Sequence, residues 1–148
     1  MKQWILRRMC AEDIGKAAEY EQQLFSEPWS EAALSDAIER KDSIYVAAIG
    51  DTLLGYCGLY LTGEEGYINQ VAVGPSFQGQ GIGKEMLSRL LSEAEEAGMN
   101  ACTLEVRTSN ARAIALYKGL GFEEAGIRPR FYQKPVEDAL IMWRRNGE

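Results

Sequence analysis

Three glycines at alternate positions separate a predicted strand from a predicted helix, and this junction constrains the fold more than any other stretch. The loop reads Gln78-Gly79-Gln80-Gly81-Ile82-Gly83, after the run EGYINQVAVGP and before an amphipathic pattern over residues 82–97. Because glycine has no Cβ, a ligand can approach the backbone closely there. A helix N-terminus also presents unpaired N–H groups, so the junction predicts a bound anion, most often a phosphate.

The spacing of these glycines differs from two common phosphate-binding loops. Gln78 stands where a Walker A loop requires its first glycine, and Glu85 follows Lys84 where that loop requires Ser or Thr. The G-x-G-x-G spacing, without a βαβ unit at the N-terminus, also fails as a Rossmann dinucleotide site. A plain flexible turn remains the alternative, since glycine is common in turns.

The hydrophobic patterns in the rest of the chain predict an α/β fold in one domain over residues 1–148. Strands are expected at residues 4–9, 65–73, 101–107, 122–133 and 137–145, with a hairpin over residues 43–61 that turns at Gly50-Asp51. Helices are expected at residues 11–25, 31–41 after the N-cap Ser30, 82–97 before the C-cap Gly98, and 110–121. The order β-α-α-β-β-β-α-β-α-β-β predicts a mixed central sheet with helices on both faces.

Composition limits the partners and the chemistry. The formal net charge of -6 argues against a nucleic-acid partner and is compatible with a basic polypeptide substrate. The chain has no histidine, which excludes Ser-His-Asp and Cys-His nucleophile pairs and nearly every histidine-ligated metal site, so no metal is expected. Cys10, Cys57 and Cys102 form no CxxC pair and lie in apolar segments, so we expect buried, reduced thiols in a cytoplasmic protein. No segment predicts a membrane span or a signal peptide.

A second group of residues lies in LEVRTSNARAIALYKGLGF, residues 104–122. Strand alternation places Leu104 and Val106 on one face and Glu105 and Arg107 on the other. A carboxylate in the middle of such a strand suggests acid-base chemistry, which in a chain without histidine must come from other side chains. The alternative is a structural Glu105–Arg107 contact on a solvated face.

These motifs resemble the GCN5-related N-acetyltransferases, the GNAT superfamily, whose Q/R-x-x-G-x-G/A pattern matches residues 78–83. The resemblance implies the GNAT fold and acetyl-coenzyme A as co-substrate. In that family the glycine loop holds the pyrophosphate through backbone N–H groups, and main-chain atoms of the preceding strand pair with the pantetheine arm. The implied cofactor-binding residues are Val71, Ala72, Val73, Gln78, Gly79, Gln80, Gly81, Ile82, Gly83, Lys84 and Asn110.

One subfamily is especially similar, the bacterial ribosomal-protein-alanine N-acetyltransferases of the RimI type. There the glutamate of L-E-V-R acts as general base and the tyrosine of A-L-Y as general acid, which implies these catalytic roles for Glu105 and Tyr117. The alternatives are a helix N-cap for Asn110 and core packing for Tyr117. FSEPWSEAAL and RPRFYQKPVEDALIM also resemble the subfamily, whereas the short segment after Tyr132, with Lys134-Pro135, departs from it and leaves the acceptor open.

Three functions therefore remain open. The first is an Nα-acetyltransferase that acts on the N-terminal amine of a protein, such as the N-terminal alanine of a small-subunit ribosomal protein. The second is an acetyltransferase for a small amine or a lysine side chain, which the resemblance around Trp29 and Tyr132 disfavours. The third is a sensor domain that binds acetyl-coenzyme A without turnover, which Glu105 together with Tyr117 disfavours. The oligomeric state is left open.

Overall fold

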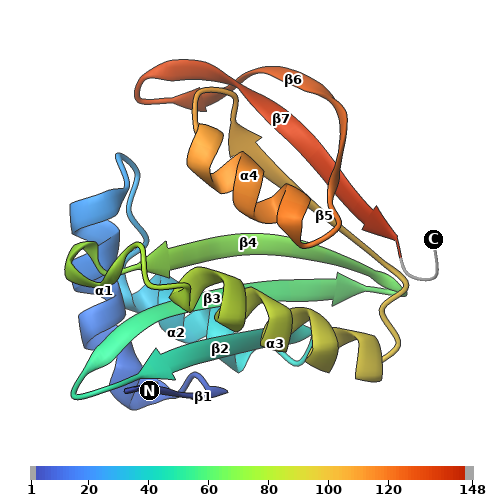
Figure 1. Ribbon diagram of the computed structural model, residues 1–148. Helices are drawn as coiled ribbons and strands as arrows, with labels where there is room; N and C mark the ends of the chain where they lie inside the picture. The colour runs from blue at the N-terminus through green and yellow to red at the C-terminus, as the bar shows by residue number, and fades with distance from the viewer. Residues whose placement is uncertain (1–2, 146–148) are drawn as a thin grey trace.

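One seven-stranded sheet organises the protein, which we describe from a computed structural model over residues 3–145. Its strands lie in the order β1-β2-β3-β4-β5-β7-β6 (Figure 1). The strands are β1 (Ile5–Arg8), β2 (Ser43–Ile49), β3 (Leu53–Thr62), β4 (Glu65–Val73), β5 (Ala101–Arg107), β6 (Glu123–Gln133) and β7 (Val136–Arg145). Neighbours are antiparallel except β4 and β5, which are parallel, so the predicted mixed sheet is confirmed.

Helices cover both faces of this sheet, as predicted. They are α1 (Ile14–Leu24), α2 (Glu31–Glu39), α3 (Ile82–Glu96) and α4 (Ala111–Gly119), with short 3-10 turns η1 (Ala11–Asp13) and η2 (Pro75–Phe77). One core, which includes Leu87 and Leu90, lies between α3 and the sheet, while Tyr20 and Leu34 of α1 and α2 pack on the other face. Figure 1 shows α3 and α4 in front of the sheet and α2 behind it.

Local signals set most helix ends. The Ser30 hydroxyl caps α2 by accepting the Ala33 N–H at 3.1 Å, and Gly98 takes a left-handed φ of 105° after α3, both as predicted. The first helix begins three residues later than expected, because residues 11–13 form a 3-10 turn. The second ends at Glu39 rather than near Lys41, because Arg40 is already extended.

The predicted burial of the three cysteine thiols is confirmed for two of them. Cys57 and Cys102 are free and buried, but Cys10 is free and exposed, so its expected burial is wrong. Cys10 follows the end of β1 and precedes η1, and its backbone N–H donates to the carboxylate of Asp13 at 2.9 Å. Its sulfur lies outside the core, 3.5 Å from Arg7 Nη1.

The two central strands β4 and β5 diverge after a short pairing. Their register joins Glu65, Gly66 and Tyr67 to residues 101–103, and within residues 3–145 no later β4 residue has a register partner on β5. Figure 1 shows the two strands separating from this end of the sheet. The β4 edge from Ile68 to Val73 therefore faces a gap, while its other edge is paired with β3.

A bulge in β4 decides which side chains face each side of the sheet. The register with β3 passes from Gly58 opposite Gln70 to Leu59 opposite Ile68, which leaves Asn69 as the extra residue. The Tyr45 hydroxyl donates to Asn69 Oδ1 at 2.9 Å and holds it in place. Such bulges re-aim side chains near functional sites.

An ion pair fixes the chain before α1. The Asp13 carboxylate, with 6% of its side chain exposed, accepts two hydrogen bonds from Arg7 at 2.8 and 2.9 Å, besides that from Cys10. Burial alone would raise the pKa of Asp13, but the hydrogen bonds and the charge of Arg7 outweigh it and hold this pKa below its ordinary value. The stabilisation is therefore present above the ordinary Asp pKa and is lost as the pH falls through the lowered one.

We expect Asp13→Asn to lower the free energy of unfolding at pH 7 by about 1–3 kcal/mol, because Arg7 loses its charged partner in a partly buried site. Denaturant titrations should show this difference shrinking below about pH 4, where the Asp13 carboxyl of the unfolded chain takes up its proton while the folded one, with its lowered pKa, stays charged. Asp51→Asn, at an exposed residue of the β2–β3 turn, serves as the control. A difference that stays constant down to pH 3 would contradict the ion-pair assignment.

Candidate active site

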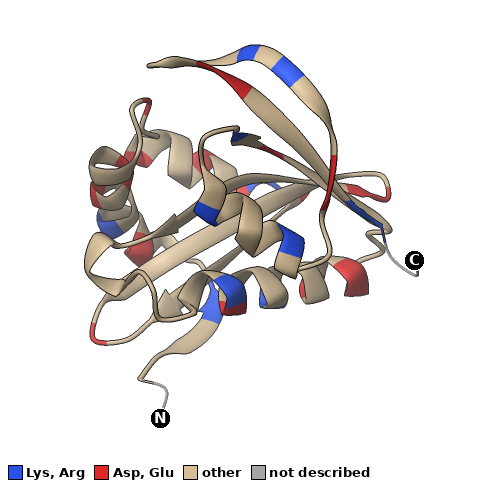
Figure 2. Ribbon diagram, turned by 45° about the horizontal axis from the view of Figure 1, so that its top comes forward, with Lys and Arg blue, Asp and Glu red and all other residues tan. Residues whose placement is uncertain are grey.

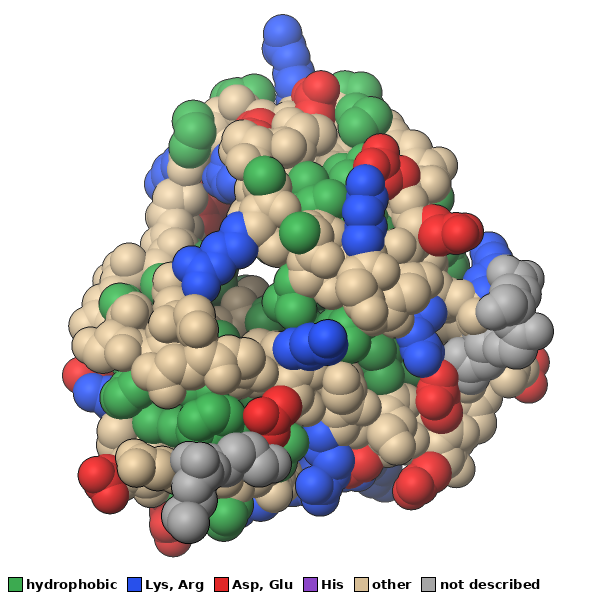
Figure 3. Space-filling view, viewed as in Figure 1, with side chains coloured by type: hydrophobic (Ala, Val, Ile, Leu, Met, Phe, Trp, Pro, Cys, Tyr) green, Lys and Arg blue, Asp and Glu red, His purple; other side chains and the backbone are tan. Residues whose placement is uncertain are grey.

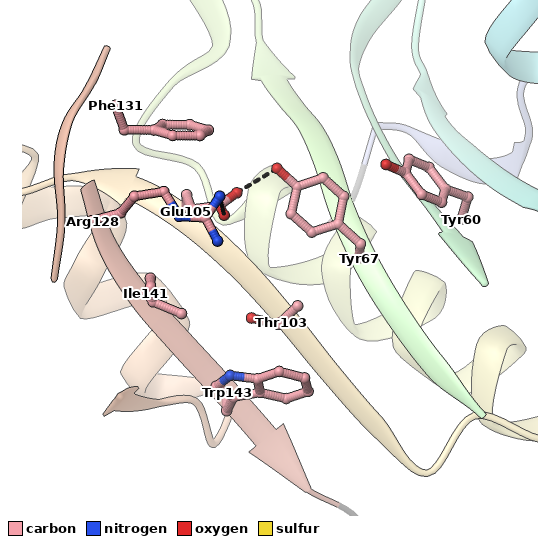
Figure 4. A pocket seen from close by; sticks show the side chains of 8 residues that line it. All are labelled: Tyr60, Tyr67, Thr103, Glu105, Arg128, Phe131, Ile141 and Trp143. Carbon is pink, nitrogen blue, oxygen red and sulfur yellow. Dashed lines mark hydrogen bonds and ion pairs between the residues drawn. The ribbon is translucent and has the colours of Figure 1, made fainter. Parts of the chain in front are cut away.

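A pocket of about 470 Å³ opens beside the diverging strands, on the sheet face that carries α1 and α2 (Figure 4). Its walls come from strands β3, β4, β5, β6 and β7. Four of the lining side chains are aromatic. The lining residues are Tyr60, Tyr67, Thr103, Glu105, Arg128, Phe131, Ile141 and Trp143. On the opposite face, Figure 3 shows a hollow between α4 and β4, where the same strands separate.

Glu105 lies in the pocket because β5 alternates as predicted. Leu104 and Val106 are buried on the other face, and the Glu105 side chain is 9% exposed. The Tyr67 hydroxyl donates to Glu105 Oε1, and Arg128 Nη1 lies 3.5 Å from Glu105 Oε2. Burial and this hydrogen bond raise the pKa of Tyr67, so Tyr67 keeps its proton and acts as a donor to Glu105.

The contact considered between Glu105 and Arg107 is not formed. Arg107 instead binds Glu137, with 3.1 Å between Nη1 and Oε1, donates to the Pro135 carbonyl at 3.0 Å and lies over the Tyr132 ring at 4.4 Å. These contacts tie the turn of the last hairpin to the end of β5. Glu105 is left to face the pocket, with partners that come from β4 and β6.

Tyr117 lies on α4, and it is not among the residues that line this pocket. Its side chain belongs to the core on the α3 face, where its ring meets Phe122 edge-on with 5.8 Å between centroids. Burial raises the pKa of Tyr117, so the phenol keeps its proton at neutral pH. The structure thus places Glu105 and Tyr117 on opposite faces of the sheet, one on each side of the gap between β4 and β5.

The glycine loop has the backbone that its sequence predicts. Gly79 and Gly81 adopt left-handed φ values of 83° and 86°, and Gly81 is the N-cap of α3. A Cβ at Gly81 would meet no described atom within 4 Å, so the N-terminus of α3 is open to a ligand. Ile82 is buried and anchors the helix, while Gln78 donates its amide to the Val73 carbonyl at 3.1 Å and ties the loop to β4.

The remaining predicted cofactor residues surround this loop. Gln80 and Lys84 are exposed, and Gly83 packs close to Val73 and Leu116. Val71, Ala72 and Val73 form the end of β4, on the stretch that faces the gap. Asn110 accepts the Ala113 N–H at 3.2 Å and is therefore the N-cap of α4, the alternative that we considered for it.

Sequence reasoning missed Arg112, Tyr67 and Arg128. Arg112 Nη2 lies 3.6 Å from the position that a Cβ would take at Gly79, which brings a positive charge to the glycine loop. The sequence did not indicate a role for Arg112, because this residue lies in the first turn of a predicted helix, far along the chain from the glycine loop. Tyr67 and Arg128 reach Glu105 only through the strand pairing.

It also missed Glu21, a fully buried carboxylate on α1. Glu21 accepts hydrogen bonds from the Trp29 N–H at 2.9 Å, from the Gln70 amide at 2.8 and 2.9 Å, and from the Tyr56 hydroxyl. Burial raises the pKa of Glu21, and these hydrogen bonds offset part of the rise. This cluster joins the α1–α2 loop to β3 and β4 next to the bulge.

Two features are absent from residues 3–145. No group of three or more Cys, Asp or Glu side chains there is arranged to hold a metal ion. No helix in the same range is long and apolar enough to cross a membrane.

Comparison with known proteins gives one consistent family. Residues 14–122 match the family described as acetyltransferase (GNAT). The N-alpha-acetyltransferase RimI of Mycobacterium tuberculosis is 38% identical over 143 residues, which cover 92% of this chain and 89% of that protein. A Mycobacterium leprae protein is 40% identical over 139 residues, 89% of this chain, but the chain spans only 38% of its length.

A solved structure supports the same fold. The ribosomal-protein-S18-alanine N-acetyltransferase of Escherichia coli superposes with a TM-score of 0.88 at 32% identity, and the match covers 96% of this chain and 93% of that one.

We expect Gly81→Val to raise the Kd of acetyl-coenzyme A at least about tenfold in calorimetry, because a branched side chain would fill the open N-terminus of α3 and displace an anion bound there. Gly98→Val is the matched control, since Gly98 also has a left-handed φ and open space but lies at the other end of α3. Both variants carry backbone strain and should lose similar thermal stability. Equal affinities in the two variants would refute the anion site.

Proposed function

Since the chain belongs to the acetyltransferase (GNAT) family, we propose that it transfers the acetyl group of acetyl-coenzyme A to the N-terminal α-amine of a protein. The acceptor we propose is the N-terminal alanine of a small-subunit ribosomal protein, and the place of action is the cytoplasm. The name of the Mycobacterium tuberculosis relative supports an α-amine as acceptor, and the name of the Escherichia coli relative supports the alanine of a ribosomal protein. The observation that carries the proposal is Glu105, a nearly buried carboxylate that faces an open pocket beside the gap between β4 and β5.

The residues around the glycine loop fit acetyl-coenzyme A, which is the co-substrate of this N-acetyltransferase and supplies an activated acetyl thioester. Two left-handed glycines at the start of α3 leave N–H groups accessible to a pyrophosphate, and Arg112 adds a positive charge. The β4 edge at Val71–Val73 has no β5 neighbour, so its backbone groups, apart from the Val73 carbonyl that Gln78 holds, are available to the pantetheine amides. A backbone N–H on this edge would also stabilise the oxyanion that develops at the thioester carbonyl.

Glu105 acts as general base in this proposal. The α-amine of a protein has a pKa of about 7.7 to 8.0, against about 10.4 for a lysine side chain, so its proton is removed with little work. A carboxylate held by Tyr67 can accept that proton directly or through one water. The acceptor amine would enter through the pocket and reach the gap from the Glu105 side.

Tyr117 acts as general acid in this proposal, from the opposite face of the sheet. Its burial keeps the phenol protonated at neutral pH, and the open space between β4 and β5 would let a thiolate come near it. A thiolate is a weaker base than a phenolate, since a thiol has an ordinary pKa of about 8.5 against about 10 for tyrosine. Tyr117 would therefore assist the departing thiolate chiefly through the hydrogen bond that it donates. Core packing against Phe122 would then hold the donor in position.

Acetylation of a small amine or a lysine remains the second candidate, whereas membership of an acetyltransferase family disfavours a non-catalytic sensor. A sensor that binds acetyl-coenzyme A without turnover requires no base in the pocket. A loss of turnover in Glu105→Gln would therefore count against the sensor function. The small amine requires no wall for a peptide, whereas here the α1–α2 loop is fixed next to β4 by Glu21. The peptide acceptor therefore fits the described residues better than either alternative.

We expect Glu105→Gln to lower kcat/KM by a factor of about 10² to 10⁴, because the amide keeps the shape of the side chain but accepts no proton. Thermal stability should change little, since the Arg128 contact is largely exposed. Glu96→Gln, at the exposed end of α3, is the control. If Glu105→Gln lowered the melting temperature and spared the rate, Glu105 would be a structural residue.

We expect a peptide that begins with Ala and continues with basic residues to be acetylated at its N-terminus, as detected by mass spectrometry. At pH 7 roughly a tenth of α-amines are neutral, against far fewer than a hundredth of lysines, so a carboxylate base favours the α-amine. The net charge of -6 should attract the basic peptide, and the KM should therefore rise with added salt. The control peptide has a blocked α-amine and an internal lysine, and its acetylation at a comparable rate would overturn the assignment.

A further inference from the structure

The guanidinium of Arg128 already lies at the carboxylate that the acceptor amine must reach. Arg128 Nη1 is 3.5 Å from Glu105 Oε2, and the guanidinium lies 5.4 Å from the centre of the Phe131 ring (Figure 4). Arg128 is 54% exposed, whereas Glu105 is 9% exposed. The guanidinium of Arg128, which is itself exposed to solvent, therefore partly covers the carboxylate of Glu105.

Several features make this contact easy to exchange. Arg128 extends from β6, where the register with β7 is interrupted between Arg128 and Tyr132 and every residue from 123 to 131 is exposed. A long, single-contact ion pair with an exposed partner has little net strength. Glu105 would keep its hydrogen bond from Tyr67 if Arg128 moved away.

The chemistry of the pocket suits a cation. Besides Glu105, its walls include the rings of Tyr60, Tyr67 and Trp143, and aromatic faces beside a carboxylate favour positively charged groups. An α-amine arrives mostly protonated at pH 7, so it competes with the guanidinium for the same carboxylate. Figure 2 shows Lys or Arg positions along β6, the outer strand of the last hairpin, in a chain that is acidic overall.

We propose that Arg128 is an internal substitute for the acceptor ammonium: it occupies Glu105 while the acceptor site is free and is displaced when the protonated α-amine binds. This inference rests on the proposed function, since it assigns the Glu105 pocket to the acceptor. Arg128 thereby sets a threshold for acceptors, because a ligand must bring its own positive charge to replace the one it removes. A ligand whose α-amine is blocked or uncharged gains nothing from the exchange.

The test compares Arg128→Gln with Arg130→Gln. Arg130 lies on the same strand, and its removal changes the net charge equally. Its hydrogen bonds to Asp138 and Gln133 are made by its backbone N–H and carbonyl. We expect Arg128→Gln to lower the KM for the Ala-basic peptide by about twofold to fivefold, the range given by an exposed ion pair, with the KM for acetyl-coenzyme A unchanged. Arg130→Gln should leave the peptide KM near the wild-type value.

Two outcomes would overturn the inference. A higher peptide KM in Arg128→Gln would mean that Arg128 binds the acceptor, and equal effects in the two variants would mean a general charge effect.

An unreactive peptide with a trimethylated α-amine gives a second readout by fluorescence polarisation, independent of turnover. It should bind Arg128→Gln more tightly than the wild type, and this difference should vanish in a Glu105→Gln background. If the wild type failed to acetylate the peptide but bound the trimethylated one with this pattern, the proposed function would fail and the Arg128 inference would stand.

Discussion

The short pairing between β4 and β5 is the constraint on which the rest of the site depends. Parallel strands that continued side by side would satisfy each other's backbone groups and close the sheet. Here the pairing stops at Tyr67, so one edge of β4 keeps its hydrogen-bonding groups for another molecule. Beside this separation, Glu105 lies on one face of the sheet and Tyr117 lies on the other, in the core under α3. The glycine loop follows directly from the end of β4, and the N-terminus of α3 therefore lies at one end of this gap.

The buried carboxylate of Glu21 supports this arrangement from the side of α1. Burying a carboxylate is costly unless its oxygens are well hydrogen-bonded, and here a backbone N–H, a phenol and an amide all donate to it. Two of the donors belong to β3 and β4, and the third belongs to the α1–α2 loop. The cost of burial is thus offset only when loop and sheet are together, so Glu21 fixes the α1–α2 loop against β3 and β4.

Local patterns in the sequence were sufficient for the elements and for part of the site. Periodicity gave the order of strands and helices, alternation gave the face of Glu105, and the glycines gave the backbone of the loop before α3. The partners of Glu105 could not be predicted, because Tyr67 is 38 residues away and reaches it only through the register of β4 with β5 and the bulge in β4. Arg128 depends in the same way on an irregular hairpin. The roles of Glu105, Tyr117 and Asn110 in catalysis and cofactor binding stay predictions, because geometry alone does not measure proton transfer.

The irregular course of β6 also affects how the molecule behaves among its own copies. β6 is an edge strand, and an open edge can pair with the edge of another sheet. Pro129 offers no N–H at the centre of this edge, and Gly126 and Arg130 bend it out of regular extension. The opposite edge, β1, is only four residues long. Both borders of the sheet therefore resist the addition of a further strand, which protects a protein with a large exposed hairpin from aggregating at high concentration.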